Sequence, residues 1–233
     1  MINIKKIIYF LIFTLIIVCC IVTTKITQAQ TQQINITLTW STDTYVPLKY
    51  QGKALPVRGS NIEIIANIDN LKINSENLIY NWFVNDYFQK ESSGFNKQIL
   101  KFNTQITINN KNVIRLEIKN INGAFLGIAY LSIETHQPEI IILTDKHEIK
   151  SNQEAQFIAQ PYFFNISNIN ELDYKWKSDE QEASKTGENN PNILILKINK
   201  LAELIKKKIS IYAENKNNNL QRAQKIIEIT LIP

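Results

Sequence analysis

The sequence predicts an all-β protein in which an N-terminal apolar segment precedes two β-sandwich domains in tandem. The stretch Tyr80-Asn81-Trp82 returns 94 positions later as Tyr174-Lys175-Trp176. Apolar and polar residues also alternate with a period of two around both copies, which is typical of strands with one buried face. A repeat of about a hundred residues suits a β-sandwich domain. We therefore expect a signal or anchor over residues 1–30 and sandwiches over 31–136 and 137–233.

The N-terminal segment has the features of an export signal. Lys5 and Lys6 precede an apolar run from Ile7 to Val22. The run is intermediate in length between a secretory signal and a membrane span, and Thr27-Gln28-Ala29 offers a cleavage site. Cleavage and retention as a single-pass anchor through residues 7–24 both stay open. Because lysines lie ahead of the run, either route places the body outside. The expected protein is exported, and it is either membrane-anchored with extracytoplasmic domains or secreted to the cell surface.

The first strand and the loop after it distinguish copy one from copy two. Residues 34–40 alternate between apolar and polar, as in a half-buried strand. Residues 41–60 then contain two prolines and two glycines, which indicate a structured loop. Copy two has no loop of this length, and exposed loops often carry function. We interpret this loop as a candidate binding surface, with the alternative that it covers the end of its own sandwich.

From residue 61 onward the two copies can be compared strand by strand. Strands are expected around 62–68, 80–82, 100–102, 114–118 and 129–133, and again around 155–159, 174–176, 196–198, 209–213 and 227–231. The turn Asn122-Gly123 supplies the positive φ angles of a tight hairpin, and asparagines at 215–219 take its place in copy two. Between the copies, Pro138 marks the joint over 135–139, because proline cannot donate to a strand ladder.

A buried tryptophan can fill the space between two sheets that lie about 10 Å apart. An alanine on the facing strand leaves room for the indole ring. The expected structural core residues are Ala66, Tyr80, Trp82, Ala159, Tyr174 and Trp176.

This pattern resembles the PKD and bacterial Ig-like domains. The resemblance is carried by Ala66, Tyr80, Trp82, Ile118, Asn120 and Gly123, and in copy two by Ala159, Tyr174, Trp176, Ala213 and Asn215. It covers about residues 60–233. Two such domains after Trp40 and Tyr45-Val46-Pro47 also look like uncharacterised surface proteins of small-genome bacteria. The resemblance implies an Ig-like fold and no particular activity, since such sandwiches support many functions.

Composition and motifs argue against nucleic-acid binding and catalysis. The formal charge is +5, but without Lys5, Lys6 and Lys25 the chain has 23 basic against 21 acidic residues, so no basic face is expected. No phosphate loop, nucleophile elbow or Cys–His pair occurs. His136 and His147 have no ligand spacing that would complete a metal site. We expect no enzyme activity, no catalytic residues, no cofactor and no metal.

Binding is the expected function. The first hypothesis is a spacer and interaction module that contacts an envelope or surface protein. The alternative is a carbohydrate- or cell-wall-binding module in which exposed aromatic rings stack on sugars. The candidate surface residues are Tyr45, Tyr50, Phe83, Tyr87 and Phe88. Burial separates the hypotheses, because a coplanar exposed row favours sugar whereas a patch with apolar neighbours favours protein.

Overall fold

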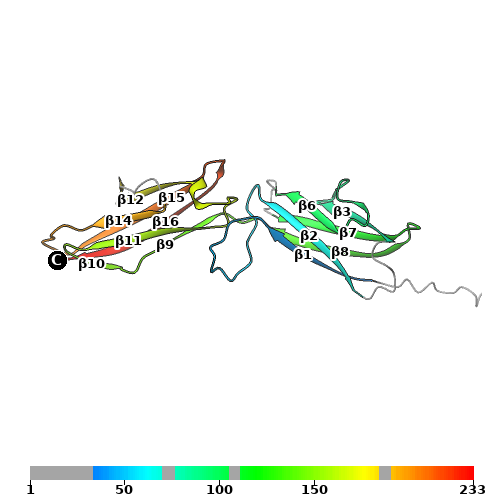
Figure 1. Ribbon diagram of the computed structural model, residues 1–233, viewed down its shortest axis with the longest axis horizontal. Helices are drawn as coiled ribbons and strands as arrows, with labels where there is room; N and C mark the ends of the chain where they lie inside the picture. Colours follow the sequence, from blue (N-terminus) through cyan, green and yellow to red (C-terminus); the bar gives the residue numbers. More distant parts are fainter. Residues whose placement is uncertain (1–33, 70–76, 105–110, 184–189) are drawn as a thin grey trace, which may run out of the picture. The chain divides into compact units, whose positions relative to one another are not determined.

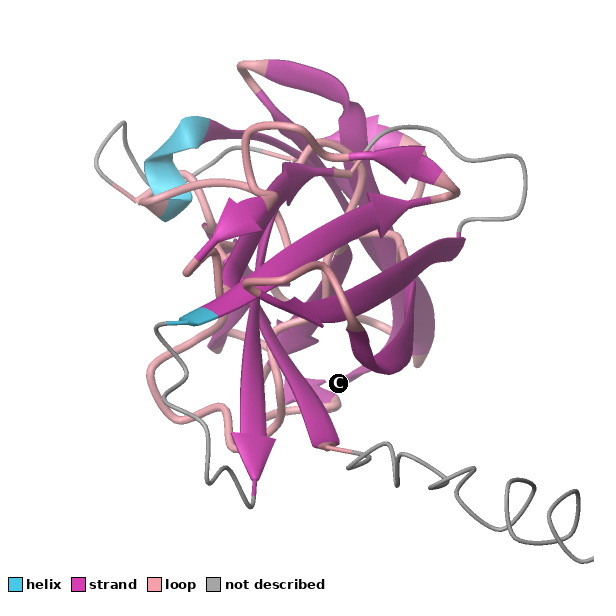
Figure 2. Cartoon of the chain, turned by 90° about the vertical axis from the view of Figure 1, so that its right-hand side faces the viewer, coloured by secondary structure: helices cyan, strands magenta, loops and turns pink. Residues whose placement is uncertain are grey.

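The computed structural model describes residues 34–69, 77–104, 111–183 and 190–233. In this part of the chain the protein is all-β, and Figure 2 shows strands and loops with only short helical turns. The N-terminal helix and the anchor expected at residues 7–24 lie outside the described residues. Among the described helices, none has the length and apolar character needed to cross a membrane.

The first sandwich contains two antiparallel sheets (Figure 1). One sheet has the order β1-β2-β6, and the other has the order β4-β3-β7-β8, with β5 paired to β3. The strands are β1 (Asn35–Thr42), β2 (Asn61–Asp69), β3 (Leu78–Val84), β4 (Tyr87–Phe88), β5 (Gly94–Phe95), β6 (Ile99–Asn103), β7 (Lys111–Asn120) and β8 (Phe125–Glu134).

The second sandwich repeats this arrangement. One sheet has the order β14-β11-β9, and the other has the order β10-β16-β15-β12-β13. The elements are β9 (Glu139–Leu143), β10 (Glu148–Lys150), β11 (Glu154–Tyr162), the 3-10 turn η2 (Ile169–Glu171), β12 (Leu172–Ser178), β13 (Gln181–Glu182), β14 (Ile193–Lys197), β15 (Ile205–Asn215) and β16 (Asn218–Ile232).

Strand order identifies both units as Ig-like. In each, the first, second and fourth major strands form one sheet, and the third, fifth and sixth form the other, with a short extra strand beside the third. In the second sandwich β10 adds a parallel pairing to the end of β16. Among the described residues of the first sandwich, a single parallel bridge between Val57 and His136 takes that place.

Each sandwich has its own hydrophobic core between its sheets. Trp82 and Tyr80 are fully buried in the first core, opposite Ala66 of β2. Trp176, Tyr174 and Ala159 take the same places in the second. Each indole also donates a hydrogen bond, from Trp82 Nε1 to the Lys97 carbonyl (2.8 Å) and from Trp176 Nε1 to the Pro191 carbonyl (3.4 Å).

Candidate functional site

The aromatic residues after Trp82 lie on a tight hairpin at the edge of the first sandwich. Asn85 and Asp86 have φ angles of 50° and 65°, as a two-residue hairpin with both central residues at positive φ requires. This turn pairs Phe83 with Phe88, whose ring centroids lie 5.4 Å apart at an interplanar angle of 57°. Tyr87 is 77% exposed, but it pairs with Val84 and so belongs to the opposite side of the ribbon.

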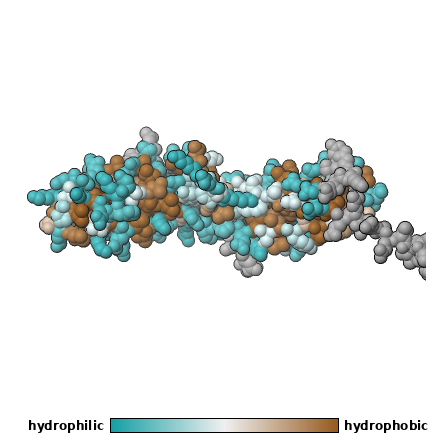
Figure 3. All heavy atoms as spheres, turned by 90° about the horizontal axis from the view of Figure 1, so that it is seen from below, coloured by the Kyte–Doolittle hydropathy of each residue, from teal (hydrophilic) through white to brown (hydrophobic). Residues whose placement is uncertain are grey.

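Phe83 and Phe88 form one corner of a larger apolar surface. Residues paired directly across a sheet share a face, so the register of β3, β5, β7 and β8 identifies the other outward side chains. We call this surface the apolar face; it comprises Ile79, Phe83, Phe88, Phe95, Val113, Phe125, Ile128 and Tyr130. Tyr130 is 65% exposed, and Phe88 and Phe95 are each 52% exposed. Figure 3 shows, for the side in view, that hydrophobic residues reach the surface among hydrophilic ones.

An ion pair lies in the middle of the apolar face. Arg115 and Glu117 are neighbouring outward residues of β7, and their side chains form a salt bridge in which each is 23% exposed. The Arg115 guanidinium also lies over the Phe83 ring, 3.7 Å from its centroid, a favourable cation–π geometry. Tyr130 and Ile128 of β8 pair with Arg115 and Glu117. Apolar side chains therefore border the ion pair on its β8 side, while on β3 Asn81 pairs with Glu117 and the Asp86 carboxylate lies 4.0 Å from Arg115 Nε.

The second sandwich carries a charged surface at the same place. Tyr80 pairs with Ile118 as Tyr174 pairs with Ala213, so the two registers can be aligned position by position. In this alignment Phe83, Val113, Phe125 and Ile128 correspond to Lys177, Lys208, Arg222 and Gln224. Arg115 and Glu117 correspond to Ser210 and Tyr212.

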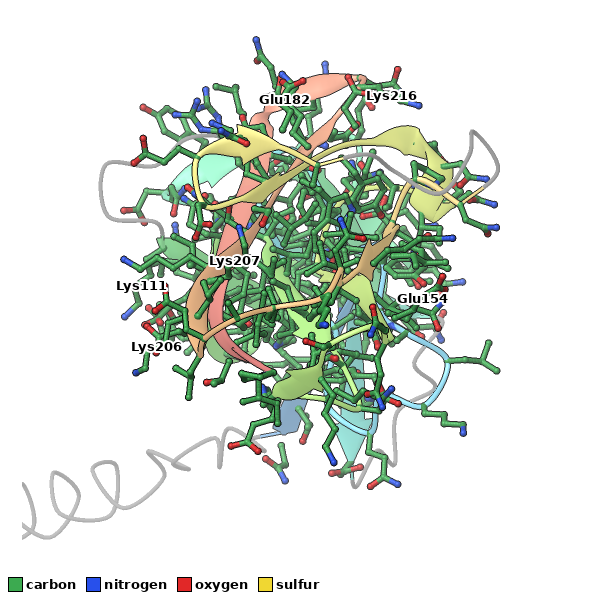
Figure 4. All side chains as sticks on the ribbon, turned by 90° about the vertical axis from the view of Figure 1, so that its left-hand side faces the viewer. Lys111, Glu154, Glu182, Lys206, Lys207 and Lys216 are labelled. Carbon is green, nitrogen blue, oxygen red and sulfur yellow. The ribbon has the colours of Figure 1, made fainter. Side chains whose placement is uncertain are left out.

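Charged side chains also project from other parts of the second sandwich. Lys206, Lys216 and Glu154 project outward at the periphery of Figure 4. We call the outward face of β12, β15 and β16 the charged face. The same strand positions therefore support either kind of surface, and folding alone does not require the apolar one.

Tyr45 and Tyr50 lie away from the apolar face, on the loop of residues 43–60, which contacts the second sandwich. The Tyr45 amide donates to the Phe164 carbonyl, the Phe163 amide donates to the Tyr45 carbonyl, and both distances are 2.7 Å. The Tyr45 side chain packs against the second core. The Tyr50 ring meets the rings of Tyr162 and Phe163 edge-on, at 5.6 and 5.8 Å.

A buried polar network fixes the end of this loop. Gln221, on β16, is fully buried; its Nε2 donates to the Arg58 carbonyl (2.8 Å) and its Oε1 accepts from the Asn165 amide (2.8 Å). Asn215 Nδ2 donates to the same Oε1 (3.0 Å). Asn165 Nδ2 donates to the Gly59 carbonyl (3.1 Å). Loop 43–60 therefore contacts the second sandwich as well as its own, where the Gly59 amide donates to the Thr104 carbonyl and the Lys53 ammonium lies over the Trp40 ring. The sequence suggested either a binding surface or a cover for its own sandwich, and the contact with the second sandwich was not predicted.

The core tyrosines Tyr80 and Tyr174 have buried hydroxyls for which the geometry gives no hydrogen-bond partner. Burial raises the pKa of Tyr80, and the nearby Gln98 side chain offsets part of that rise. Burial, and then the neighbouring Tyr45, raises the pKa of Tyr174. Neither tyrosine is poised to act as an acid or base near neutral pH, because both favour the neutral form.

The described part of the chain does not form a metal-binding site. Among those residues no three His, Cys, Asp or Glu side chains come together as a metal site. His136 serves a structural role instead: its amide donates to the Pro56 carbonyl (2.8 Å) beside the bridge to Val57.

Sequence reasoning missed the β8 half of the apolar face. It considered only the inward positions of that strand, Ala129, Leu131 and Ile133. A usable signal was present, because the segment from Phe125 to Leu131 is apolar at every position apart from the hydroxyl of Tyr130. A strand that is apolar on both sides is expected to be covered on both sides.

Comparisons with known proteins give fold likeness alone. No family model matches the sequence, and no curated protein matches it. Among solved structures, the chain is similar to three N-terminal domains of the bacteriophage RB49 Highly Immunogenic Outer Capsid protein (13% identity, TM-score 0.45, 85% of this chain and 59% of that one). It is also similar to fibronectin(III)-like modules of Clostridium thermocellum CbhA (10% identity, TM-score 0.30, 83% of this chain and 93% of that one). A third is the mouse nectin-like molecule 4 ectodomain, Ig1–Ig3 (10% identity, TM-score 0.34, 84% of this chain and 66% of that one). The chain thus spans about three fifths of the first structure and two thirds of the third.

Proposed function

We propose that this chain is a non-enzymatic, extracytoplasmic interaction module that binds a protein through the apolar face of its first sandwich. The observation that carries the proposal is the contrast between the apolar face and the charged face on equivalent strands. Contiguous exposed apolar surface is unusual on a soluble domain and is typical of interaction sites. Ig-like domains commonly mediate contacts between proteins, which agrees with this assignment.

The proposed location rests on the sequence. Lysines before the apolar run of residues 7–22 favour export, with the sandwiches outside the cytoplasm. Retention of residues 7–24 would tether the module to the membrane, whereas cleavage would release it. We also propose that the protein acts at the cell envelope and takes part in adhesion.

A protein partner fits the geometry better than a carbohydrate does. Sugar binding needs accessible aromatic rings that form a flat platform. Phe83 and Phe88 are tilted by 57° to each other, and Tyr50 already packs on Tyr162 and Phe163. The exposed neighbours of the phenylalanines include aliphatic side chains such as those at positions 113 and 128, which suit a protein surface.

Site-specific photo-crosslinking in the producing cells tests the proposal. A photo-reactive phenylalanine analogue replaces Tyr130 on the apolar face or, as the matched control, Ile226 at the equivalent position of the charged face. We expect a protein adduct of discrete mass from position 130 and at least tenfold less from position 226. Equal yields from both positions, or none from position 130, would contradict the proposal.

A second variant shows whether such an adduct depends on the face itself. Val113→Lys, Phe125→Arg and Ile128→Gln give the first sandwich the residues that the second already carries at these positions. The adduct from position 130 should then disappear while the melting temperature stays close to that of the parent. Retention of the full chain on purified cell wall, unaffected by this triple variant, would instead support the carbohydrate alternative for another surface.

A further inference from the structure

We infer that the partner of the apolar face is a second copy of this chain, paired around a two-fold axis that crosses β7 at Leu116. This inference rests on the proposed function and adds the identity of the partner. The ion pair indicates the chemistry of the partner, because an entirely apolar partner would bury Arg115 and Glu117 without supplying further hydrogen bonds. Their own salt bridge offsets part of the cost of burial, and a partner with a cation and a carboxylate at matching positions offsets more of it.

The apolar face itself supplies this complement. Consider a two-fold axis that lies parallel to the sheet and perpendicular to β7. Rotation about this axis places β7 of one copy over β7 of the other, with the two strands antiparallel. With the axis at Leu116, Arg115 of each copy lies opposite Glu117 of the other. A two-fold interface uses the same patch on both subunits, so a patch that carries both charges symmetrically about its centre can be self-complementary.

The apolar residues of β8 obey the same symmetry. Tyr130 pairs with Arg115 and Ile128 pairs with Glu117 on the neighbouring strand. The axis that matches the charges therefore also sets Tyr130 of one copy against Ile128 of the other. On β3 the axis sets Phe83 of one copy against Asn81 of the other, and along β7 it sets Val113 against Lys119. The compensated charged centre is therefore flanked by apolar contacts on its β8 side.

The second sandwich does not offer such a pairing. Ser210 and Tyr212 occupy the positions of the ion pair, and Lys177 and Lys208 occupy those of Phe83 and Val113. The equivalent axis at Ile211 would set Lys177 of one copy against Lys175 of the other, although it would also set Lys208 against Glu214 and Arg222 against Glu228. The exchange of ion-pair partners at the axis is accordingly specific to the first sandwich.

A charge-swap matrix tests the inference on the full chain, with two differently tagged copies expressed together and recovered through one tag. Wild type should recover wild type. Arg115→Glu paired with itself, and Glu117→Arg paired with itself, should each recover at least tenfold less, because four like charges meet at the axis. Arg115→Glu paired with Glu117→Arg should recover close to the wild-type amount, because the two carboxylates of one copy then lie opposite the two guanidinium groups of the other.

The mixed pair guards against misfolding, since two unfolded variants cannot rescue each other. Ser210→Glu paired with itself is the control for added charge on the charged face, and it should behave as wild type. The inference is overturned if the mixed pair recovers no more than Arg115→Glu with itself, or if wild type does not recover wild type. If position 130 still crosslinks to a different protein in that case, the proposed function stands and only the identity of the partner is wrong.

Discussion

At the scale of single residues, Trp82 carries the largest individual contribution to the first core that the structure indicates. It is fully buried between the sheets and its indole N–H is bonded to the Lys97 carbonyl. Trp82→Ala should lower the free energy of unfolding by about 3–5 kcal/mol, through the lost transfer energy and the cavity left behind. Chemical denaturation measures the change.

Trp40→Ala is the matched control for this prediction. Trp40 is half-buried on β1, with the Lys53 ammonium 3.4 Å from its ring centroid. Its truncation should cost clearly less than that of Trp82. An unchanged melting temperature in the Trp82 variant would show that the core assignment is wrong.

Tyr174 links stability to alkaline pH. Its buried hydroxyl lacks a hydrogen-bond partner, and burial raises its pKa above the ordinary value of about 10. A raised folded-state pKa contributes stability that is complete below about pH 10 and is lost as the pH rises further, since the unfolded chain ionises first. Tyr174→Phe removes this loss, and at neutral pH it should be neutral or stabilising by up to about 1 kcal/mol.

Denaturation of both proteins between about pH 8 and pH 12 measures the effect, with the pH range set by the tyrosine pKa. The advantage of Tyr174→Phe should grow above about pH 10. A constant difference across the range would mean that Tyr174 does not titrate differently in the folded state.

At the scale of elements, substitutions at two turn glycines distinguish the cost of backbone strain from the cost of a steric contact. Gly59, in loop 43–60, has a φ of +86°, and a Cβ there would lie 3.2 Å from Asn218 Nδ2. Gly123 has a φ of +82° with open space around it. Gly123→Ala should therefore show only the strain of a left-handed residue, roughly 1–2 kcal/mol.

Gly59→Ala should cost more than Gly123→Ala, because it adds the displacement of Asn218 to the same strain. Urea denaturation of the two variants gives the comparison. The reverse order would show that loop 43–60 does not lie against Asn218.

The sequence predicted the strands well because their signals are local. Alternation gave β1, β2, β7 and β8 and their counterparts, because it depends on neighbouring residues alone. The Asn122-Gly123 pair marked the place of the hairpin turn, but of these two residues only Gly123 has a positive φ, and none of residues 215–219 has one, so the expected backbone conformation was wrong there. The partner of loop 43–60 could not be predicted in this way. Gln221 lies 163 positions from Arg58, and a contact over that separation leaves no pattern in either segment.

The candidate site was predictable in part. Phe83 and Phe88 stand out as aromatics next to the repeated motif, and the structure places them on the apolar face. Arg115 and Glu117 read as ordinary outward charges of an amphipathic strand. Only the register with β8 shows that Tyr130 and Ile128 lie directly beside them.

At the scale of the whole molecule, the network around Gln221 couples loop 43–60 to the second sandwich. Gln221→Leu leaves the Arg58 carbonyl and the Asn165 amide without their side-chain partner, which should cost about 1–3 kcal/mol. Gln224→Leu, on the exposed part of β16, is the matched control and should be close to neutral.

The coupling should also be visible in the unfolding transition. In the Gln221→Leu variant the two sandwiches should unfold over more widely separated temperatures in calorimetry than in the parent protein. A variant whose transition keeps its parental width and midpoint would contradict a coupling role for Gln221.

The position of Gln221 on β16, the last strand, has a consequence for the order of folding. Domains form roughly in the order in which the chain emerges, so the first sandwich can close before its loop has any partner in the second. Tyr45 and Tyr50 gain their partners at positions 162–164 first, and the Arg58 carbonyl gains Gln221 only when β16 has paired. The contact between Gln221 and the loop is therefore among the last to form, because it requires synthesis to have reached β16.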